Sequence, residues 1–210
     1  MARKIFLVRH GEADSNAGGF FAGWKDVPLT PLGHRQALLL SKRLLHEPIG
    51  RAYCSDLLRA KQTLEAISLR CPVEFSHALR EKNYGELEGV KWEENEKKYE
   101  KYHLDSSARA PGGENNSDVQ KRVCEYFEKT IINSTEDQVL VVSHHGPIVL
   151  FACQMLGMPI SNWRRLRLGN CGLCIFSKEG KTWRLTLWNS LSHYGLMGFR
   201  PLLASERRIG

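Results

Sequence analysis

Two apolar stretches of this sequence end in histidine followed by glycine. The first, FLVRHG, contains His10, and the second, VLVVSHHG, contains His144 and His145. Both stretches have the length and composition of buried strands. In an open α/β sheet, ligands bind beyond the carboxyl ends of the strands. Imidazoles that follow two strands of one sheet are therefore expected to face a single site.

Arginine accompanies these strand ends. Arg9 directly precedes His10, and Arg59 lies in CSDLLRAKQT, after another short strand and in the first turns of a predicted helix. A guanidinium group matches two anion oxygens at once, and a helix N-terminus favours negative charge. Glu81, in LREKNYGELEG, follows the strand expected at 73–75 and is expected to bring a carboxyl group to the same rim. Together these residues predict a phosphate site.

The elements that must position these side chains alternate between strands and helices. A helix is expected from residue 31, with Thr30 as N-cap and Pro31 in the first turn. Strands are expected at 4–8, 51–54, 73–75, 139–143, 171–177 and 182–188. Helices are expected at 31–45, 56–69, 118–132 and 146–156, with a charged, helix-like segment at 89–103 and a loop at 110–118.

This alternation predicts a three-layer α/β/α fold. Its sheet should hold about six mostly parallel strands, with one antiparallel edge strand supplied by the closing hairpin. The sequence has no repeat, low-complexity tract or linker rich in Pro, Gly or Ser. We therefore expect a single domain over residues 1–210, with an excursion around 84–116 that caps the substrate.

Composition narrows the class of partner. The formal net charge of +7 favours an anionic one. No RNA-binding or helix-turn-helix signature accompanies the short basic clusters, no apolar run is long enough to span a membrane, and no leader peptide is recognisable. The six cysteines are scattered, and the Cys171–Cys174 pair lacks the further ligands of a zinc site. We expect a cytoplasmic protein without nucleic-acid, membrane or metal partners.

Six stretches carry a family resemblance, in the family's order over most of the chain to about residue 150. The sequence resembles the histidine phosphatase superfamily, also called the phosphoglycerate mutase-like family. The later segment WNSLSHYG is similar to that family's closing strand. The six stretches are LVRHGEADSN, GWKDVPLTPLGHRQA, CSDLLRAKQT, LREKNYGELEG, APGGENNSDVQKRV and VVSHHGPI.

The resemblance implies a role for each main residue. His10 would be the nucleophile that forms a phosphohistidine, in the neutral form and with its tautomer fixed by a hydrogen bond. Arg9, Arg59 and His144 would hold the phosphoryl oxygens and stabilise their charge. Glu81 would protonate the leaving oxygen and then act as base on water. No metal or cofactor is needed in this scheme.

Other positions complete the predicted site. By resemblance, Asn16 would donate to the phosphate, and Gly23 and Trp24 would lie near the entrance, with Tyr84 on the substrate rim. The family usually has glycine after its second histidine, where this chain has His145. We expect His144 to be the phosphate ligand, with His145 as the alternative or as an extra donor.

Three questions stay open at this level. Glu86 and Glu88 lie close to Glu81 in sequence, although the alignment of LRE before YG favours Glu81. Lys82, together with Lys91 and Arg109, is a hypothetical reader of a second anionic group. Oligomeric state is also open, with a homodimer as the candidate assembly.

The acid segment and the length of the chain bear on the reaction type. Mutases of the family typically continue Glu-Arg-His-Tyr-Gly after the acid, whereas this chain has Glu-Lys-Asn-Tyr-Gly. Mutases also carry a longer insertion before the second histidine, and the PGGEN loop resembles the phosphatase branch. We therefore favour a phosphatase for a small phosphorylated metabolite. The alternatives are a phosphoglycerate mutase and, from a different class, a non-catalytic phospho-binding module.

Overall fold

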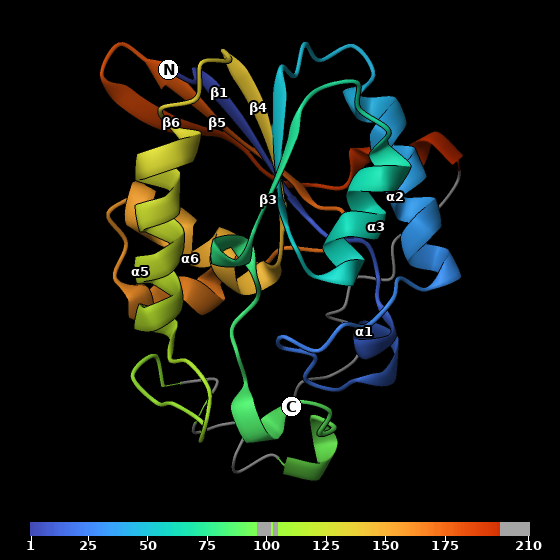
Figure 1. Ribbon diagram of the computed structural model, residues 1–210, viewed down its shortest axis with the longest axis vertical. Coiled ribbons are helices and arrows are strands. Elements are labelled where there is room, and N and C mark those ends of the chain that lie inside the picture. The colour runs from blue at the N-terminus through green and yellow to red at the C-terminus, as the bar shows by residue number, and fades with distance from the viewer. Residues whose placement is uncertain (96–101, 103–104, 198–210) are drawn as a thin grey trace.

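A computed structural model describes residues 1–95, 102 and 105–197 (Figure 1). Its centre is one six-stranded sheet with the strand order β3-β2-β4-β1-β5-β6. Strands β1, β2, β3 and β4 are mutually parallel, β5 runs antiparallel to β1, and β6 runs antiparallel to β5. The strands are β1 (Lys4–Arg9), β2 (Arg51–Ser55), β3 (Val73–Ser76), β4 (Gln138–Ser143), β5 (Leu173–Glu179) and β6 (Thr182–Ser190).

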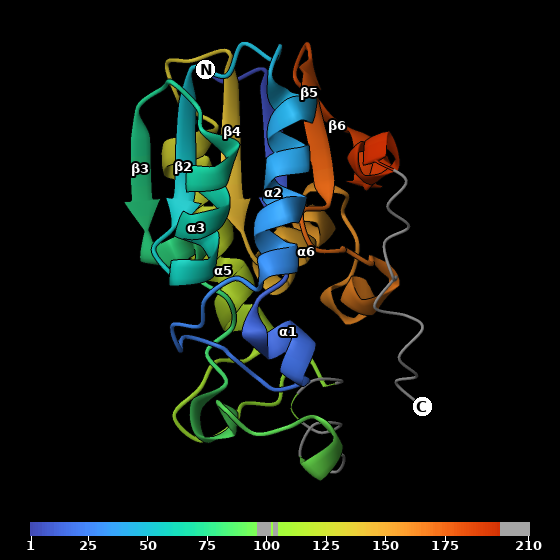
Figure 2. The ribbon, with the colours of Figure 1, turned by 90° about the vertical axis from the view of Figure 1, so that its right-hand side faces the viewer.

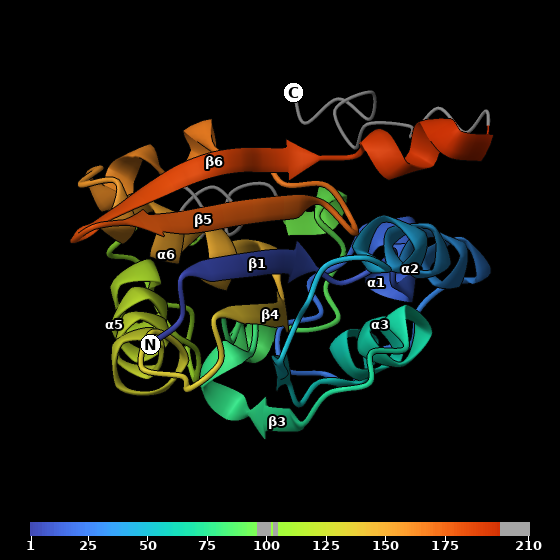
Figure 3. The ribbon, with the colours of Figure 1, turned by 90° about the horizontal axis from the view of Figure 1, so that it is seen from above.

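Helices cover both faces of this sheet. Helices α2 (Pro31–Leu44) and α3 (Leu58–Ile67) lie on one face, and α5 (Asn116–Tyr126) and α6 (His145–Met155) lie on the other (Figure 3). A separate apolar core fills each interface. This confirms the predicted three-layer α/β/α fold, with its antiparallel pairing confined to one edge. Short helical turns complete the described chain: α1 (Asp14–Gly18), η1 (His77–Leu79), η2 (Gly85–Leu87), η3 (Glu93–Asn95), the π-helical η5 (Phe127–Ile131), η6 (Ile160–Arg165) and η7 (Ser192–Met197).

The strongest local signals gave correct elements. The central strands β1 and β4 are apolar between their polar end residues because helices cover both of their faces. Helix α2 begins as predicted, with the Thr30 hydroxyl oxygen accepting the Gly33 N–H at 3.0 Å and Pro31 in the first turn.

Three predicted helical segments differ from the structure. The helix expected at 118–132 begins two residues earlier, at Asn116 inside the predicted loop, and continues from Phe127 as the π-helical η5. The helix expected at 56–69 begins only at Leu58, because the carboxylate of Asp26, distant in sequence, accepts the Leu58 N–H at 2.8 Å. In the helix-like segment expected at 89–103, Lys91 forms an isolated β-bridge with Phe20, and a short 3₁₀ turn follows at Glu93–Asn95. Residues 96–101 and 103–104 of that prediction lie outside the described residues.

The end of the sheet at which the parallel strands finish also carries α1 and the described part of the excursion (Figure 2). A small third core joins the loop after α1 to the excursion, with Phe21, Leu87 and Ala110 buried and Tyr84 and Trp92 packed against them. The fold therefore collects the ends of β1, β2 and β4, one short helix and the excursion around one region.

Candidate active site

The carboxyl ends of β1 and β4 bring two histidines together. The strands are parallel neighbours in which Arg9 pairs with Ser143, so His10 and His144 leave the sheet side by side. The His10 N–H donates to the Ser143 carbonyl at 3.0 Å, and the two imidazole centroids lie 5.0 Å apart. The parallel pairing of β1 with β4 places these residues side by side, and local sequence does not report that pairing.

The His10 ring is held in one tautomer. Its Nδ1 lies 2.7 Å from the Gly11 carbonyl oxygen, which can only accept, so Nδ1 carries the hydrogen and Nε2 keeps its lone pair. The side chain is buried, at 4% exposure. Burial, reinforced by the charges of Arg59 and Arg9, lowers the pKa of His10 well below its ordinary value. A neutral imidazole with a free Nε2 is the form that a nucleophile requires.

The turn after His10 is packed tightly against the start of α2. A Cβ atom on Gly11 would lie 2.5 Å from the Gly33 carbonyl oxygen, which is too close for any side chain. The Gly11 N–H donates to the Thr63 hydroxyl at 3.0 Å, and that hydroxyl donates to the Arg59 carbonyl at 2.7 Å. The peptide that orients the His10 ring is therefore tied to both α2 and α3.

Among the described residues, two buried nitrogens at the site have no hydrogen-bond partner. Arg9 donates from Nη1 to the Leu168 carbonyl at 2.7 Å, but its Nε is unpaired. His144 contacts the Ser55 hydroxyl through Nε2 at 2.8 Å, but its Nδ1 is unpaired. Buried polar groups are rarely left unsatisfied in folded proteins. Donors of this kind beside a free imidazole nitrogen fit an anion that binds between them.

Arg59 adds positive charge from the first turn of α3. Its guanidinium is buried, and it donates from Nη2 to the Gly23 carbonyl at 2.8 Å and from Nη1 to the Lys25 carbonyl at 3.1 Å. Burial lowers the pKa of Arg59 to about 10, against the opposing effect of Glu81, so the group stays charged near neutral pH. Two of its five N–H groups are used by these carbonyls, and the others remain for an anion.

Glu81 is the acid that the structure places beside the histidines. Its carboxylate accepts the Lys82 N–H at 2.9 Å and the Gly146 N–H at 3.2 and 3.3 Å, at the start of α6. Of the two other candidates, Glu86 is exposed, and Glu88 accepts the main-chain N–H groups of the entrance loop and the excursion. The geometry therefore favours Glu81.

The contact between the Glu81 carboxylate and the Gly146 N–H explains why a glycine follows the histidine pair. A Cβ atom on Gly146 would be 2.3 Å from the Glu81 Oε1, so the carboxylate needs a residue without a side chain here. His145, at the position where the family pattern has glycine, instead directs its ring edge-on to Trp163, with centroids 6.0 Å apart. Its charge also contributes to the low pKa of His10. The structure thus brings His145 near the site without replacing His144.

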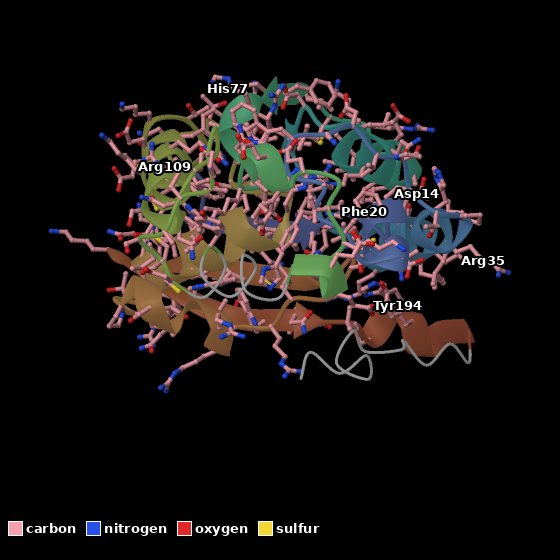
Figure 4. All side chains as sticks on the ribbon, turned by 90° about the horizontal axis from the view of Figure 1, so that it is seen from below. Asp14, Phe20, Arg35, His77, Arg109 and Tyr194 are labelled. Atoms are coloured by element: carbon pink, nitrogen blue, oxygen red, sulfur yellow. The ribbon has the colours of Figure 1, made fainter. Side chains whose placement is uncertain are left out.

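The predicted entrance residues come from two loops that hold one another. Gly23 has φ of 52°, and a Cβ there would lie 2.0 Å from the Glu88 carboxylate. Trp24 donates from Nε1 to the Glu81 carbonyl at 2.9 Å and lies 4.9 Å from the Arg80 guanidinium. Tyr84 packs on the Phe21 ring, with centroids 4.7 Å apart. In Figure 4, which views this end, Phe20 lies near α1, with Arg109 across from it.

Lys82 and Arg109 have protein partners, which weakens the hypothesis that they read a second anionic group. Lys82 is buried and donates to the Tyr102 carbonyl at 2.8 Å and the Asn116 side chain at 3.2 Å, and burial lowers its pKa to about 8. Arg109 forms an ion pair with Asp118 at 2.6 Å. Both side chains tie the excursion to α5.

Sequence reasoning missed four residues that support the site. Arg122, on α5, donates to the Glu81 carbonyl at 2.8 Å and forms an ion pair with Glu114 at 2.7 Å, which holds the acid segment. Of the four, only Ser55 had a local signal in the sequence, because it is a polar residue at the carboxyl end of a strand, where ligands bind in such sheets. The four residues are Ser55, Thr63, Arg122 and Asn170.

Acidification is expected to destabilise the fold through its buried histidines. Burial lowers the pKa of His193 to about 4, and burial also holds the pKa values of His10 and His144 well below the ordinary 6.5. Below about pH 6.5 the unfolded chain binds protons that the folded chain does not, so stability falls as pH falls. Each histidine contributes a slope of about 1.4 kcal/mol per pH unit.

Urea unfolding between about pH 6.5 and 5 measures this slope. The variant His193→Leu should lower the slope of unfolding free energy against pH by about the contribution of one histidine. His193 lies outside the site, so its removal leaves His10 and His144 in place. An unchanged slope in this variant would show that His193 is protonated in the folded protein.

The described residues offer neither a metal site nor a membrane-spanning helix. Among the described residues, no group of three or more His, Cys, Asp or Glu side chains is placed to hold a metal ion. Cys171 and Cys174 are buried free thiols. Within the same part of the chain, no helix has the length and apolar character needed to cross a membrane.

Similar proteins agree on one family. The model of the histidine phosphatase superfamily (branch 1) matches residues 5–191. A protein of Serratia proteamaculans named probable phosphoglycerate mutase GpmB is 32% identical over 192 residues, which are 88% of this chain and 89% of that protein.

Solved structures show the same likeness. Bacillus stearothermophilus YhfR superposes with a TM-score of 0.84 at 26% identity, covering 91% of this chain and 99% of that one. A putative alpha-ribazole-5'-P phosphatase from Escherichia coli gives a TM-score of 0.81 at 26% identity, covering 90% and 98% of the two chains. A mycobacterial glucosyl-3-phosphoglycerate phosphatase gives 0.78 at 27% identity, covering 90% and 100%.

The match over residues 5–191 includes His10, the helix that carries Arg59, and His144. The chain therefore belongs to the histidine phosphatase superfamily, branch 1.

Proposed function

We propose that this protein is a metal-independent phosphomonoester hydrolase for a small phosphorylated metabolite, acting through a phosphohistidine on His10. The observation that carries the proposal is the state of the His10 ring. Its Nδ1 is bound to the Gly11 carbonyl, its Nε2 is free, and the unpaired Arg9 Nε and His144 Nδ1 belong to its immediate neighbours. A nucleophile and anion donors are thus brought together by one sheet edge.

In the first half-reaction, His10 Nε2 attacks phosphorus, and the bond between phosphorus and the ester oxygen breaks. The protonated carboxyl group of Glu81 gives its proton to the departing oxygen. Arg9, Arg59 and His144 bind the three peripheral oxygens, whose charge they stabilise through the transition state. If the Ser55 hydroxyl donates to His144 Nε2, then Nδ1 carries the hydrogen that the phosphoryl group accepts.

In the second half-reaction, the Glu81 carboxylate takes a proton from water as the water oxygen attacks phosphorus. The bond from phosphorus to Nε2 breaks, its electron pair returns to the imidazole, and inorganic phosphate leaves. The Gly146 N–H and the Arg122 contact hold the acid segment in place for both steps. We also propose that the excursion around 84–116 forms the cap over this site within a single domain.

A phosphoglycerate mutase is the second candidate, because the curated relative from Serratia proteamaculans carries that name. The Glu-Lys-Asn-Tyr-Gly segment and the likeness to structures titled as phosphatases support the hydrolase. A mutase must return the phosphoryl group to its substrate and keep water out, whereas a phosphatase admits water.

A screen of phosphorylated metabolites with the purified protein, with and without EDTA, tests the proposal. We expect release of inorganic phosphate from at least one phosphomonoester at a rate that EDTA does not change. Interconversion of 2- and 3-phosphoglycerate without phosphate release would replace the hydrolase with the mutase. Phosphate binding without turnover of any ester would favour the non-catalytic module.

A further inference from the structure

The loop between η6 and β5 lies against the end of β1 and the main chain of His10. Several hydrogen bonds join this loop, residues 168–172, to the end of β1, including one from the Arg9 N–H to the Gly172 carbonyl at 3.4 Å. Arg9 donates from Nη1 to the Leu168 carbonyl at 2.7 Å, and the Cys171 N–H lies 3.0 Å from the Arg9 carbonyl and 3.2 Å from the His10 carbonyl. The loop therefore touches both the main chain of the nucleophile and one of its cationic neighbours.

The side chain of Asn170, in this loop, bridges two groups of the site. Its Nδ2 donates to the His10 carbonyl oxygen at 3.2 Å and to the Asn16 Oδ1 at 3.2 Å. The Ala13 N–H donates to the same Oδ1 at 3.0 Å. The Ala13 N–H can only donate, so the Asn16 atom that it meets must be the oxygen Oδ1. Asn170 therefore faces two oxygens, the Asn16 Oδ1 and the His10 carbonyl oxygen, and only its amide nitrogen can donate to both.

This arrangement decides which way Asn16 can donate. With Oδ1 occupied by two donors, the N–H groups of Asn16 Nδ2 stay available on the other side of the amide. We propose that Asn170 is a positioning residue, which fixes the Asn16 amide as a phosphate donor and holds it at a set distance from the His10 main chain. The inference rests on the proposed function, because it concerns the anion that the site binds.

Other contacts anchor this bridge from the end of the chain. The hydroxyl of Tyr194, in η7, donates to the Asn170 carbonyl at 2.5 Å, and the Gly169 N–H donates to the Asn189 side chain at 2.8 Å. These contacts hold the loop main chain without using the Asn170 amide. Tyr194→Phe is therefore a matched control, because it removes one hydrogen bond from the same residue and leaves the bridge intact.

Orthovanadate, an analogue of the transition state, is the probe. Asn170→Ala should weaken vanadate inhibition about tenfold, as expected for a hydrogen bond network to a charged ligand. Asn170→Asp, which keeps the size but sets an oxygen against two oxygens, should weaken it by more, about 100-fold. Tyr194→Phe should change vanadate inhibition by less than about twofold, although this variant should have a lower thermal midpoint of unfolding.

A double-mutant cycle distinguishes positioning from a general structural role. If Asn170 acts through Asn16, Asn170→Ala should cause no further loss in an Asn16→Ala background. Additive losses, or a loss in Tyr194→Phe equal to that in Asn170→Ala, would overturn the inference. The isosteric Asn170→Asp keeps the test available if Asn170→Ala does not fold. A wild-type protein that neither binds vanadate nor releases phosphate would instead overturn the proposed function.

Discussion

His10→Ala should abolish turnover, with kcat/KM for any phosphomonoester substrate lowered by on the order of 10⁵-fold. No other described side chain combines a free imidazole nitrogen, a carbonyl-fixed tautomer and adjacent arginines. The loss should appear in kcat, because Arg9, Arg59 and His144 remain to bind the phosphate. Rapid quenching with labelled substrate should reveal a phosphoenzyme in the wild type and none in the variant.

His34→Ala is the control for this experiment. His34 is exposed on α2, so its removal should leave turnover unchanged. Thermal melting should show that His10→Ala remains folded. If the His10 variant kept more than about one hundredth of the activity, the nucleophile would be another residue.

Glu81→Gln should produce the second-largest loss, and the loss should depend on the leaving group. An alkyl phosphomonoester needs a proton on its departing oxygen, so its kcat/KM should fall about 10³-fold. An aryl ester such as p-nitrophenyl phosphate leaves without that help and should lose less than about tenfold in the first step. Without a base for water, the phosphohistidine should then accumulate, and p-nitrophenol should appear as a burst.

Glu86→Gln is the matched control, because this acid lies on the same segment but is exposed. It should leave kcat/KM unchanged for both the alkyl and the aryl ester, and it should show no burst of p-nitrophenol. Equal losses with alkyl and aryl esters in Glu81→Gln would contradict the role of general acid. They would point instead to a loss of structure around Gly146 and Lys82, whose N–H groups the carboxylate accepts.

Much of the fold could be predicted from local signals. The runs around Phe6 and Val141 are apolar because both faces of the sheet are covered, and such runs are recognisable in any sequence. Thr30 and Pro31 mark a helix start through contacts within a few residues. The start of α3 was misplaced because its capping carboxylate, from Asp26, arrives from a distant loop. Local patterns cannot report such a partner.

The candidate site divides in the same way. His10, Arg9 and His144 were predictable because strand ends in a parallel sheet meet at one edge. The choice of Glu81 over Glu86 and Glu88 also rested on sequence, through alignment with the family pattern, and the contact with Gly146 now gives it a physical basis. The roles of these residues stay predictions that the variants above test.

The layer architecture, the family and the candidate phosphate-binding side chains could be predicted from the sequence, because periodicity, strand-end chemistry and motif order can be read along the chain. The tautomer of His10, the unpaired nitrogens of Arg9 and His144, and the bridge from Asn170 to Asn16 could be found only in the folded chain. The unpaired donors and the Asn170 bridge depend on burial and hydrogen bonds among segments far apart in the chain, and the Gly11 peptide that fixes the tautomer is held by Thr63 of α3. Such contacts arise only when β1, β4 and the 168–172 loop are folded against one another.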